Sequence, residues 1–520
     1  MKISFIIGLI SVMLTFDAFS QNFNRPVPEK TFKYEFKSYQ ALSPANYFIS
    51  PFKVPSDTSD PNHIIPMPML LDENGYLLWY MRPWENSTLF RPFESQNKSG
   101  FINRNIQKES YYKILDENFQ YIDSFTNSPG IYADVHEFII LDNGNYLISG
   151  AKDSIMDLSA YTFDGVQGSD TTRIIGFVIE EFDINHNLIF QWNSNDYIHP
   201  NESIVETFGY HPHSFDYCHG NAIEQDYDGN FLVSMRHLNA IYKISRTTGA
   251  VIWILGGKSS YFSFTNDPGF SGQHDIRRLA NGNVSLYDNA NSAPAPKESR
   301  AVEYLLDTIN WTAAKVWEFK NSSPIYAFAM GNFQTTSQGT RLINFGFSNS
   351  FYPHPNISVI DATSNAIADI FFGDSVYNYR AYVLQKDLNL PRPLINCFLE
   401  SGLYYLAAPS GYDKYLWSTG DTTEKIQIQT PGEYQLWVNY GIGMLGSEPI
   451  TITNLAVDCK VSGISPNAIL DPEVIEEIFD ISGRRIFHPK IGNLYLVRYS
   501  TGNSQIIAWN ESYRKYLQLK

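Results

Sequence analysis

The sequence predicts an all-β protein whose main part is a β-propeller, and three observations lead to this prediction. Charged residues make up only 18% of the 520 residues while aromatic residues reach 15%, and aromatic and β-branched residues favour pleated, half-buried strands. Helical periodicity over more than about ten residues is hard to find in the chain. Short apolar runs instead alternate with tight polar turns between about residue 24 and residue 390.

The first 20 residues have the pattern of a secretory signal peptide. Lys2 precedes an apolar run from Ile3 to about Leu14, and small residues at positions 18 and 20 suit a cleavage site. The run is too short for a comfortable membrane span, and no other segment reaches the necessary length. We therefore expect an exported protein without a membrane span, which is periplasmic, bound to the cell surface or secreted.

Two kinds of segment recur in residues 21–390. A turn followed by an apolar strand is found at residues 72–80, 141–150, 226–235, 280–289 and 338–346. A strand, a polar turn and a second strand follow each other at residues 111–125, 180–192, 242–255, 303–319 and 357–372. Asn-Gly and Asp-Gly pairs supply the positive φ angles that hairpin turns need. Such recurrence without helices predicts a radial array of small antiparallel sheets, with a pair of β-sandwiches as the alternative; the repeats alone do not give the number of blades.

The composition changes after residue 390, where two further domains are expected. Residues 391–460 alternate apolar and polar positions, as in a small β-sandwich, and the run YLWSTGDTT resembles immunoglobulin-like modules of secreted Bacteroidetes proteins. In residues 461–520, the runs IFDISGRR and LYLVRY resemble the C-terminal sorting domain of the type IX secretion system. This resemblance implies a β-rich domain and the secretion machinery as a partner.

Three cysteines are present, and they suggest different roles. Cys218 is predicted to be a small buried residue. Cys397 and Cys459 bracket the predicted sandwich and could form a disulfide in an oxidising compartment.

Histidines beside the repeated strands are the strongest indication of a functional site. His136, His219 and His274 lie seven to nine residues before an Asn-Gly or Asp-Gly turn, and Arg236 closes the strand FLVSMR. Equivalent offsets in successive blades would direct three imidazoles towards one axis. The net charge of −16 disfavours nucleic acid and anionic membranes as partners, so an anionic substrate requires a locally positive pocket such as this one.

The same region resembles the bacterial aryl-sulfate sulfotransferases. The resemblance rests on VHEFIILDNGNYL, DYCHGNAIEQDYDGNFLVSMRHLNAIYKI, WILGG, GQHD, SLYDN and ESRAVEYLLD, and it covers roughly residues 130–320. It implies a six-bladed propeller that moves a sulfuryl group from an aryl sulfate to a phenol. It also implies a reaction without a nucleotide sulfate donor, and we expect no cofactor.

The resemblance also implies roles for five residues. His274, in GQHD, is the expected nucleophile and becomes a sulfohistidine. His219 and Asn221, in HGNAI, are expected to contact the sulfuryl oxygens, as are Arg236 and His136. His219 or His136 is the expected general acid and base.

The chemistry of sulfuryl transfer suits these residue types. Negative charge spreads over oxygens in the transition state, so fixed Arg and His donors stabilise it, and a neutral imidazole is a competent nucleophile. Two other functions stay open: a silent propeller that binds a polyanion or glycan, and an aryl-sulfate hydrolase that uses water as the acceptor. No metal is expected, because His211, His213 and His219 have no fourth ligand at a suitable spacing.

Several neighbours of these residues have predicted supporting roles. His237 follows Arg236 in a strand and is expected to point to the opposite face. Acidic residues flank the histidines and either orient the rings or cap backbone groups, and a strand end next to the site offers further orienting groups. The flanking acids are Asp134, Glu137, Asp216 and Asp275, the strand end holds Asp288 and Asn289, and Arg300 and Glu303 are expected to stabilise a blade junction.

Overall fold

The computed structural model contains almost only β-strands in the residues that it describes. These are residues 25–29, 31–40, 44–53, 66–81, 86–104, 111–163, 166–204, 215–348, 354–459, 475–480, 494–499 and 504–508. The predicted signal peptide lies outside them, as does most of the predicted sorting domain. Within the described part, no helix is long and apolar enough to cross a membrane.

The chain divides into two compact units. The larger contains Met1–Asn396, Leu406–Ile426 and Thr430–Thr453, and the smaller contains Cys397–Tyr405, Gln427–Gln429 and Asn454–Lys520. The sequence predicted one module over residues 391–460, whereas this division distributes that stretch between both units.

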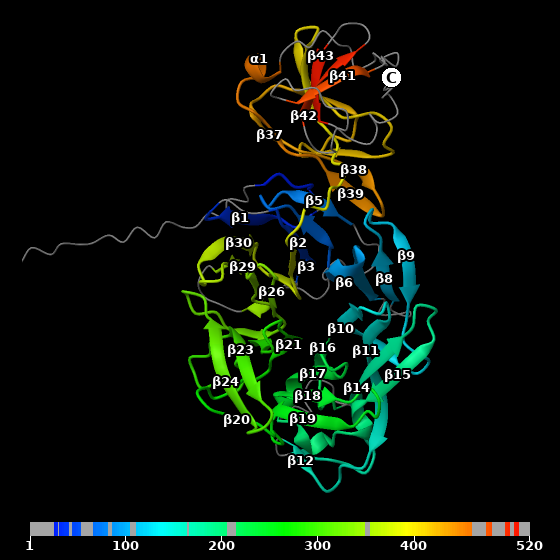
Figure 1. Cartoon of the computed structure of the whole chain (residues 1–520), viewed down its shortest axis with the longest axis vertical. Coiled ribbons are helices and arrows are strands. Elements are labelled where there is room, and N and C mark those ends of the chain that lie inside the picture. The colour runs from blue at the N-terminus through cyan, green and yellow to red at the C-terminus, as the bar shows by residue number, and fades with distance from the viewer. Residues whose placement is uncertain are drawn as a thin grey trace, which may run out of the picture. The chain divides into compact units, whose positions relative to one another are not determined.

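Four sheets of the larger unit are built from strands that follow one another in the chain (Figure 1). The first contains β6 (Asn86–Phe93), β7 (Lys98–Arg104), β8 (Tyr111–Leu115) and β9 (Tyr121–Phe125). The second contains β10 (Tyr132–Ile140), β11 (Tyr146–Met156), β14 (Thr172–Phe182) and β15 (Leu188–Asn193). The third contains β16 (Gly220–Gln225), β17 (Phe231–Met235), β18 (Ala240–Ile244) and β19 (Val251–Gly256). The fourth contains β21 (His274–Arg278), β22 (Val284–Asp288), β23 (Arg300–Asp307), β24 (Thr312–Phe319) and the short β20 (Ser263–Phe264).

The fifth and sixth sheets combine strands from distant parts of the chain. The fifth consists of β26 (Asn332–Thr335), β27 (Arg341–Asn344), β29 (Ile357–Ile360) and β30 (Ala366–Phe372), with β1 (Tyr34–Ser38) at its edge. In the sixth, β32 (Tyr382–Leu384) pairs with β2 (Asn46–Ile49), followed by β4 (Met69–Leu71) and β5 (Leu77–Tyr80). The strands β39 (Gly443–Gly446), β38 (Leu436–Tyr440) and β35 (Tyr415–Trp417) extend this sheet beyond β5.

Apolar cores lie between successive sheets and show that the sheets form a closed ring. Separate clusters join the second sheet to the third, the third to the fourth, the fourth to the fifth and the fifth to the sixth. One further cluster contains Trp79 of the sixth sheet, Phe90 of the first and Phe138 of the second. The inner strands β6, β10, β16, β21 and β26 contact one another in that order and surround the middle of the ring (Figure 1). The fold is therefore all-β and propeller-like, as predicted.

The repeats seen in the sequence correspond to defined strands of these sheets. The five turn-and-strand segments contain the second strand of their sheets, or β5 in the sixth sheet. The five double-strand segments form the third and fourth strands of the first five sheets, counted from the inner strand. Several of these strands, among them β18 and β29, are buried along their whole length, so the polar turns between the strands mark the hairpins more clearly than an alternating pattern does.

Short elements complete the larger unit. Three two-stranded sheets pair β3 (Pro51–Lys53) with β31 (Val376–Asn378), β12 (Thr162–Phe163) with β13 (Val166–Gln167), and β25 (Ala327–Ala329) with β28 (Phe347–Ser348). A fourth pairs β37 (Gly432–Tyr434) with β40 (Ile450–Ile452). Four 3-10 turns are described: η1 (Glu94–Gln96), η2 (Ser194–Asp196), η3 (Pro200–Glu202) and η4 (Arg236–Leu238).

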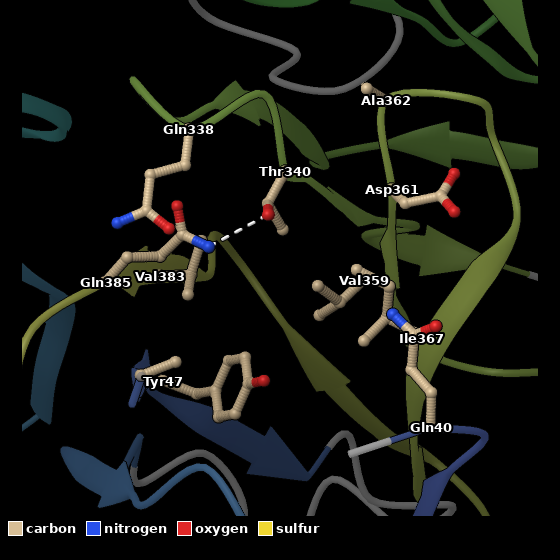
Figure 2. Close-up of a pocket in the computed structure, with 11 residues that line it drawn as sticks. Gln40, Tyr47, Gln338, Thr340, Val359, Asp361, Ala362, Ile367, Val383 and Gln385 are labelled. Carbon is tan, nitrogen blue, oxygen red and sulfur yellow. Dashed lines mark hydrogen bonds between the residues drawn. The ribbon is translucent and has the colours of Figure 1, made fainter. Parts of the chain in front are cut away.

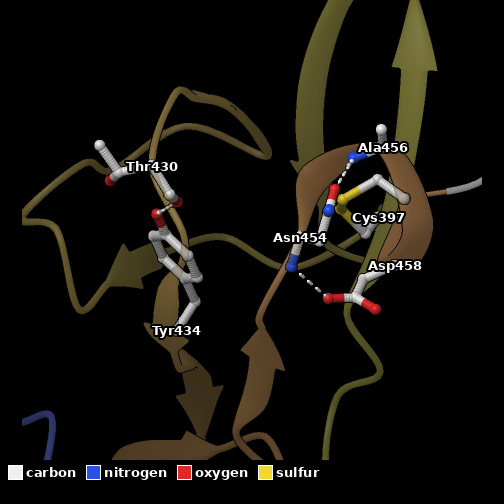
Figure 3. Close-up of a disulfide and its surroundings, with 7 residues drawn as sticks. Cys397, Thr430, Tyr434, Asn454, Ala456 and Asp458 are labelled. Carbon is white, nitrogen blue, oxygen red and sulfur yellow. Dashed lines mark hydrogen bonds between the residues drawn. A yellow bond between two sulfur atoms is a disulfide. The ribbon is translucent and has the colours of Figure 1, made fainter.

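The smaller unit contains a disulfide between Cys397 and Cys459 (Figure 3). Cys459 follows the short helix α1 (Leu455–Asp458), whose N-cap Asn454 accepts a hydrogen bond from the Ala456 amide at 3.0 Å. The strands β41 (Ile475–Asp480), β42 (Leu494–Tyr499) and β43 (Ser504–Ala508) form one antiparallel sheet. The strands β33 (Asn396–Glu400), β34 (Leu403–Ala407) and β36 (Lys425–Ile428) form a further sheet, and each of them contains residues of both units. The third cysteine, Cys218, is a buried free thiol, as predicted.

Breaking the disulfide is expected to destabilise the smaller unit. The bond closes a loop with a sequence separation of 62 residues. The chain-entropy model then gives a loss of up to about 4 kcal/mol in the Cys397→Ser/Cys459→Ser variant. Thermal unfolding followed by circular dichroism with and without dithiothreitol measures this loss. The reductant should lower the stability of the wild type and leave the variant unchanged, and equal stability of both proteins without reductant would contradict the expectation.

Candidate active site

Three inner strands change their pairing register at the candidate residues. The register of β10 shifts between Ala133 and Phe138, that of β16 between Gly220 and Ala222, and that of β21 between His274 and Arg277. Such irregularities bend a strand and redirect its side chains, and they are common next to active sites. Three of the candidates, His136, Asn221 and His274, therefore lie where the backbone departs from a regular ladder.

His136 lies within the irregular part of β10 and is held by a carboxylate. Its Nδ1 lies 2.7 Å from Asp134 Oδ1, and the same oxygen accepts a hydrogen bond from the Ser149 hydroxyl at 3.0 Å. Burial raises the pKa of the Asp134 carboxyl, but the neighbouring His136 and His219 outweigh it and keep this pKa below its usual value. Because an ionised carboxylate only accepts, Nδ1 of His136 carries a proton and Nε2 is left for other contacts.

His219 is held in the same way immediately before β16. Its backbone has a positive φ of 47°, and its Nδ1 lies 2.5 Å from Asp216 Oδ2. The ring centroids of His136 and His219 are 5.0 Å apart. The two imidazoles are therefore neighbours, although 83 residues separate them in the chain.

Arg236 and His237 lie together in η4 and not in a strand, so the prediction that His237 points to the opposite face is wrong. The strand β17 ends at Met235, and the turn is bonded to the segment before β16 through the carbonyls of Cys218 and His219. A 3-10 turn does not alternate its side chains as a strand does, so both residues reach the same side. The Arg236 guanidinium donates a hydrogen bond to His237 Nε2 at 2.9 Å and another to the Phe328 carbonyl at 2.8 Å.

His237 therefore supports His219. Its ring stacks on the His219 ring with centroids 4.6 Å apart, and its Nδ1 donates to the Asp216 carbonyl at 2.7 Å. Burial, followed by the charges of His219 and Arg236, lowers the pKa of His237 to about 3 against the opposing charge of Asp216. His237 is thus a neutral acceptor for the guanidinium at neutral pH.

His274 is the first residue of β21 and the most deeply buried of these histidines, with 2% of its surface exposed. Its Nδ1 lies 2.7 Å from Asn289 Oδ1, and its Nε2 accepts a hydrogen bond from the Met330 amide at 3.1 Å. Burial, then the charge of Arg236, lowers the pKa of His274 well below its usual value, and His136 and His219 act in the same direction. The imidazole is therefore neutral at neutral pH and close enough to the cluster to be influenced by its charges.

Asn221 lies beside His274 rather than among the other histidines. Its amide is fully buried and donates to the carbonyl of Gln273 at 2.8 Å, which ties β16 to the start of β21. Its Oδ1 has no hydrogen-bond partner among the described residues. The structure thus places Asn221 next to the strand that carries the expected nucleophile.

A buried ion cluster lies next to the histidines, and its extent could not be predicted from the sequence. Glu137, the residue after His136, has no exposed surface. It binds Arg91 of β6 at 2.8 Å, Arg277 of β21 at 2.8 Å and Arg380 at 3.0 Å. Asp275, which follows His274 directly, binds Arg277 at 2.6 Å and accepts a hydrogen bond from the Phe333 amide at 3.2 Å, so it caps a backbone group and does not orient the ring. Of the flanking acids, Asp134 and Asp216 orient imidazoles, while Glu137 and Asp275 bind arginines.

Two further predictions concern residues outside the cluster. Arg300 pairs with Asp267, Asp288 and Glu318, which belong to the fourth sheet and the loop before β21, so its ion pairs lie within one sheet and not at the expected blade junction. Glu303 lies 3.4 Å from Arg341 of the fifth sheet.

Tyr379 is a site residue that the sequence analysis missed. Its ring lies 5.6 Å from that of His136, and its buried hydroxyl has no hydrogen-bond partner among the described residues. No turn motif or strand repeat precedes it. Its place next to His136, between β31 and β32, could be recognised only from the structure, in which the sheets close into a ring.

Three of these residues have the geometry of a metal site, but their contacts do not suit a metal. One ligand atom each of Asp216, His219 and His237 lie within 4.8 Å of one another. Both ring nitrogens of His237 are already engaged, one by the Asp216 carbonyl and one by a guanidinium. A cation there would face the positive Arg236, so we assign no metal to the cluster. His211 and His213 lie outside the described residues.

Figure 2 shows a separate cavity between the fifth and sixth sheets. Its volume is about 330 Å³, and Tyr47 of β2, Val359 of β29 and Val383 of β32 are among its lining residues. The Gln385 amide donates to the Thr340 hydroxyl at 2.8 Å across its wall. None of the candidate residues lines this cavity, so it is distinct from the histidine cluster.

The histidine cluster falls within a part of the chain that matches a family model. Residues 100–351 match the model of the arylsulfotransferase (ASST) family. All five candidate residues and Asn289 lie in this arylsulfotransferase region, whereas Arg91, Tyr379 and Arg380 lie outside it. No curated protein matches the chain significantly.

Solved structures show only remote similarity. A protein of unknown function from Bacteroides caccae is 11% identical, with a TM-score of 0.41 over 66% of this chain and 100% of the other. A virginiamycin B lyase from Staphylococcus aureus is 10% identical, with a TM-score of 0.33 over 73% and 96%. A putative 6-phosphogluconolactonase from Bacteroides fragilis is 12% identical, with a TM-score of 0.35 over 67% and 100%. At these scores none of them informs the function of the arylsulfotransferase region.

Replacing Glu137 by Gln tests the ion cluster. The change leaves three buried or half-buried arginines without their shared carboxylate and should lower the free energy of unfolding by about 3–5 kcal/mol at pH 7. Burial raises the pKa of Glu137, but Arg277, Arg380 and Arg91 outweigh it and lower this pKa to about 2. Its contribution is therefore complete above the ordinary value of 4.5 and is lost as the pH falls towards 2.

Urea unfolding of both proteins between pH 7 and pH 2 measures this difference, which should narrow as the solution becomes acidic. Glu224→Gln is the matched control, since burial raises the pKa of Glu224 to about 6 and this carboxyl is not the shared partner of the arginines. A loss of the same size in both variants would contradict the assignment.

Proposed function

We propose that the chain transfers a sulfuryl group from an aryl sulfate to a phenol through a sulfohistidine at His274. The observation that carries the proposal is the neutral, buried imidazole of His274 beside His136, His219 and Arg236, in a region that matches the arylsulfotransferase family. The six sheets are the blades of a six-bladed propeller in this proposal, and the site lies where their inner strands meet.

The first half of the reaction forms the covalent intermediate. The Nε2 lone pair of His274 attacks sulfur, so that an N–S bond forms and the bond between sulfur and the aryl oxygen breaks. The electron pair leaves on the phenolate, which takes a proton from His219 or His136. Arg236 and the remaining histidine donate hydrogen bonds to the sulfuryl oxygens, on which negative charge accumulates.

The second half returns His274 to its starting state. The histidine that gave its proton removes one from the acceptor phenol, whose oxygen attacks sulfur. The N–S bond breaks, and its electron pair returns to Nε2. Asp134 and Asp216 hold the Nδ1 atoms of His136 and His219, so proton exchange takes place at Nε2 of either ring.

The remaining predictions for this chain complete the proposal. The enzyme is exported after removal of residues 1–20, it carries an immunoglobulin-like module in residues 391–460, and residues 461–520 address it to the type IX secretion machinery. The disulfide of the smaller unit supports export, since such bonds persist in oxidising compartments.

The first test is an assay of 4-nitrophenol release from 4-nitrophenyl sulfate, with and without added phenol. We expect release that depends on phenol and falls by at least about a thousandfold in His274→Ala, because the nucleophile is lost. His186→Ala is the matched control, as this histidine binds Asp123 near the protein surface. Release independent of phenol would indicate a hydrolase, and no release from any aryl sulfate would indicate a binding protein.

The pH dependence of the donor half-reaction tests the state of His274. The unprotonated imidazole is the nucleophile, and its pKa is well below the usual 6.5. The burst of 4-nitrophenol in single-turnover experiments should therefore keep its rate as the pH falls from 7 to 5.5. A decline of the burst rate with an apparent pKa near 6.5 would mean that His274 titrates as an ordinary histidine. The same decline in His237→Gln would show that it does not come from His237.

A further inference from the structure

We propose that Asn289 is a positioning residue that fixes the tautomer of His274, so that the lone pair of the ring lies on Nε2, and that also holds the Met330 peptide beside this nitrogen. The meaning of this role for catalysis rests on the proposed function. The geometry of the contact itself does not, because it concerns two buried side chains and one loop. Asn289 directly follows β22, the strand that pairs with β21.

The orientation of the Asn289 amide is determined by its other contacts. Its Nδ2 donates hydrogen bonds to the carbonyls of Ala327 at 2.8 Å and Met330 at 3.0 Å. Both N–H groups are thus used, and rotating the amide would place its oxygen against two carbonyls. The side chain has no exposed surface, so water cannot replace the lost bonds. Oδ1 must therefore face His274.

This orientation determines where the proton of His274 lies. Asn289 Oδ1 is only an acceptor, and it lies 2.7 Å from Nδ1 of His274, so Nδ1 carries the proton. The lone pair of the neutral ring is then on Nε2. The Met330 amide lies 3.1 Å from Nε2 and donates to it, which is consistent with this tautomer. The nitrogen expected to attack sulfur is thereby selected.

An amide achieves this selection without making the ring more basic. The rings of His136 and His219 are anchored by the carboxylates of Asp134 and Asp216, whereas His274 is anchored by a neutral group. A carboxylate beside an imidazole favours the protonated ring, which has no lone pair to attack with. Asn289 fixes the same tautomer and leaves the ring neutral. Once the N–S bond forms, the ring becomes positive and the Nδ1–H bond to Asn289 becomes charge-assisted.

The Met330 amide has to leave Nε2 when the N–S bond forms. Met330 and Gly331 both have positive φ angles, of 63° and 96°. The Met330 carbonyl accepts a hydrogen bond from the Asn289 amide. The amide that covered the lone pair then lies next to the incoming group and can donate to a sulfuryl oxygen. Asn289 thus links the ring and the loop through one side chain.

The test uses the full-length protein labelled with 15N-histidine. Long-range 1H–15N spectra, assigned with His274→Gln, report which ring nitrogen carries the proton and need no substrate. We expect a proton on Nδ1 of His274 in the wild type. In Asn289→Asp the apparent pKa of His274 should rise by about 1–3 pH units, because a carboxylate replaces the amide.

Asn332→Asp is the matched control. Asn332 is a fully buried amide of the neighbouring β26, and it bonds in both directions to the backbone of Ala381. The Asn332→Asp substitution should therefore leave the apparent pKa of His274 unchanged. Thermal unfolding of both variants shows whether they fold, and Asn289→Leu, which removes the acceptor without adding charge, should yield a mixture of tautomers.

The outcomes separate this inference from the proposed function. A proton on Nε2 in the wild type, or an unchanged titration in folded Asn289→Asp, would overturn the role of Asn289. If the spectra are as expected but the protein releases no 4-nitrophenol, the sulfotransferase proposal is wrong and the positioning role of Asn289 still holds. If both hold, the acid limb of kcat/KM should move upwards in Asn289→Asp by the shift seen in the spectra, and the limb of Asn332→Asp should not.

Discussion

The buried carboxylate of Glu137 is the interaction on which the arrangement of the inner strands depends. It belongs to the second sheet, and its partners come from the first sheet, the fourth sheet and the segment before β32. The amide of Ile223 in the third sheet adds a contact at 3.3 Å. Charges without exposed surface are tolerated only when each has its partners, so the inner strands must take their places together. Because Glu137 follows His136 directly, the same constraint positions the first of the catalytic candidates.

Around this cluster, one rule describes how the imidazoles are held. In His136, His219, His237 and His274, Nδ1 faces an oxygen acceptor, supplied by two carboxylates, a backbone carbonyl and an amide. Each ring therefore presents Nε2 away from its anchor. The acceptors differ in charge: carboxylates hold His136 and His219, whereas neutral oxygens hold His237 and His274. Similar histidine side chains thus lie in different chemical environments because their partners differ. These partners cannot be recognised from the positions of the histidines in the sequence.

Much of the fold could be predicted because hairpins leave a local signal. The Asn-Gly and Asp-Gly turns and the alternating strands after them gave the blades, and equal offsets from those turns indicated His136, His219 and His274. The sixth sheet could not be predicted, since β2, β32 and β39 lie far apart in the sequence and each is short. Arg380 likewise meets Glu137 across 243 residues, and nothing in its local sequence indicates a partner. His237 was misjudged because a 3-10 turn cannot be distinguished from the end of a strand by pattern alone.

The origin of the strands in the sixth sheet also determines when the fold can be completed during synthesis. Its strand β2 pairs with β32, and its strand β5 pairs with β39, and both partners are made much later in the chain. A ribosome has to deliver more than four-fifths of the chain, through Gly446, before that sheet is complete. The edge of β2 stays open until β32 has been made, and that of β5 until β39 has been made, and pairings over such long separations form slowly. Assembly of the site is therefore a late event in the life of the chain, delayed by residues that take no part in its chemistry.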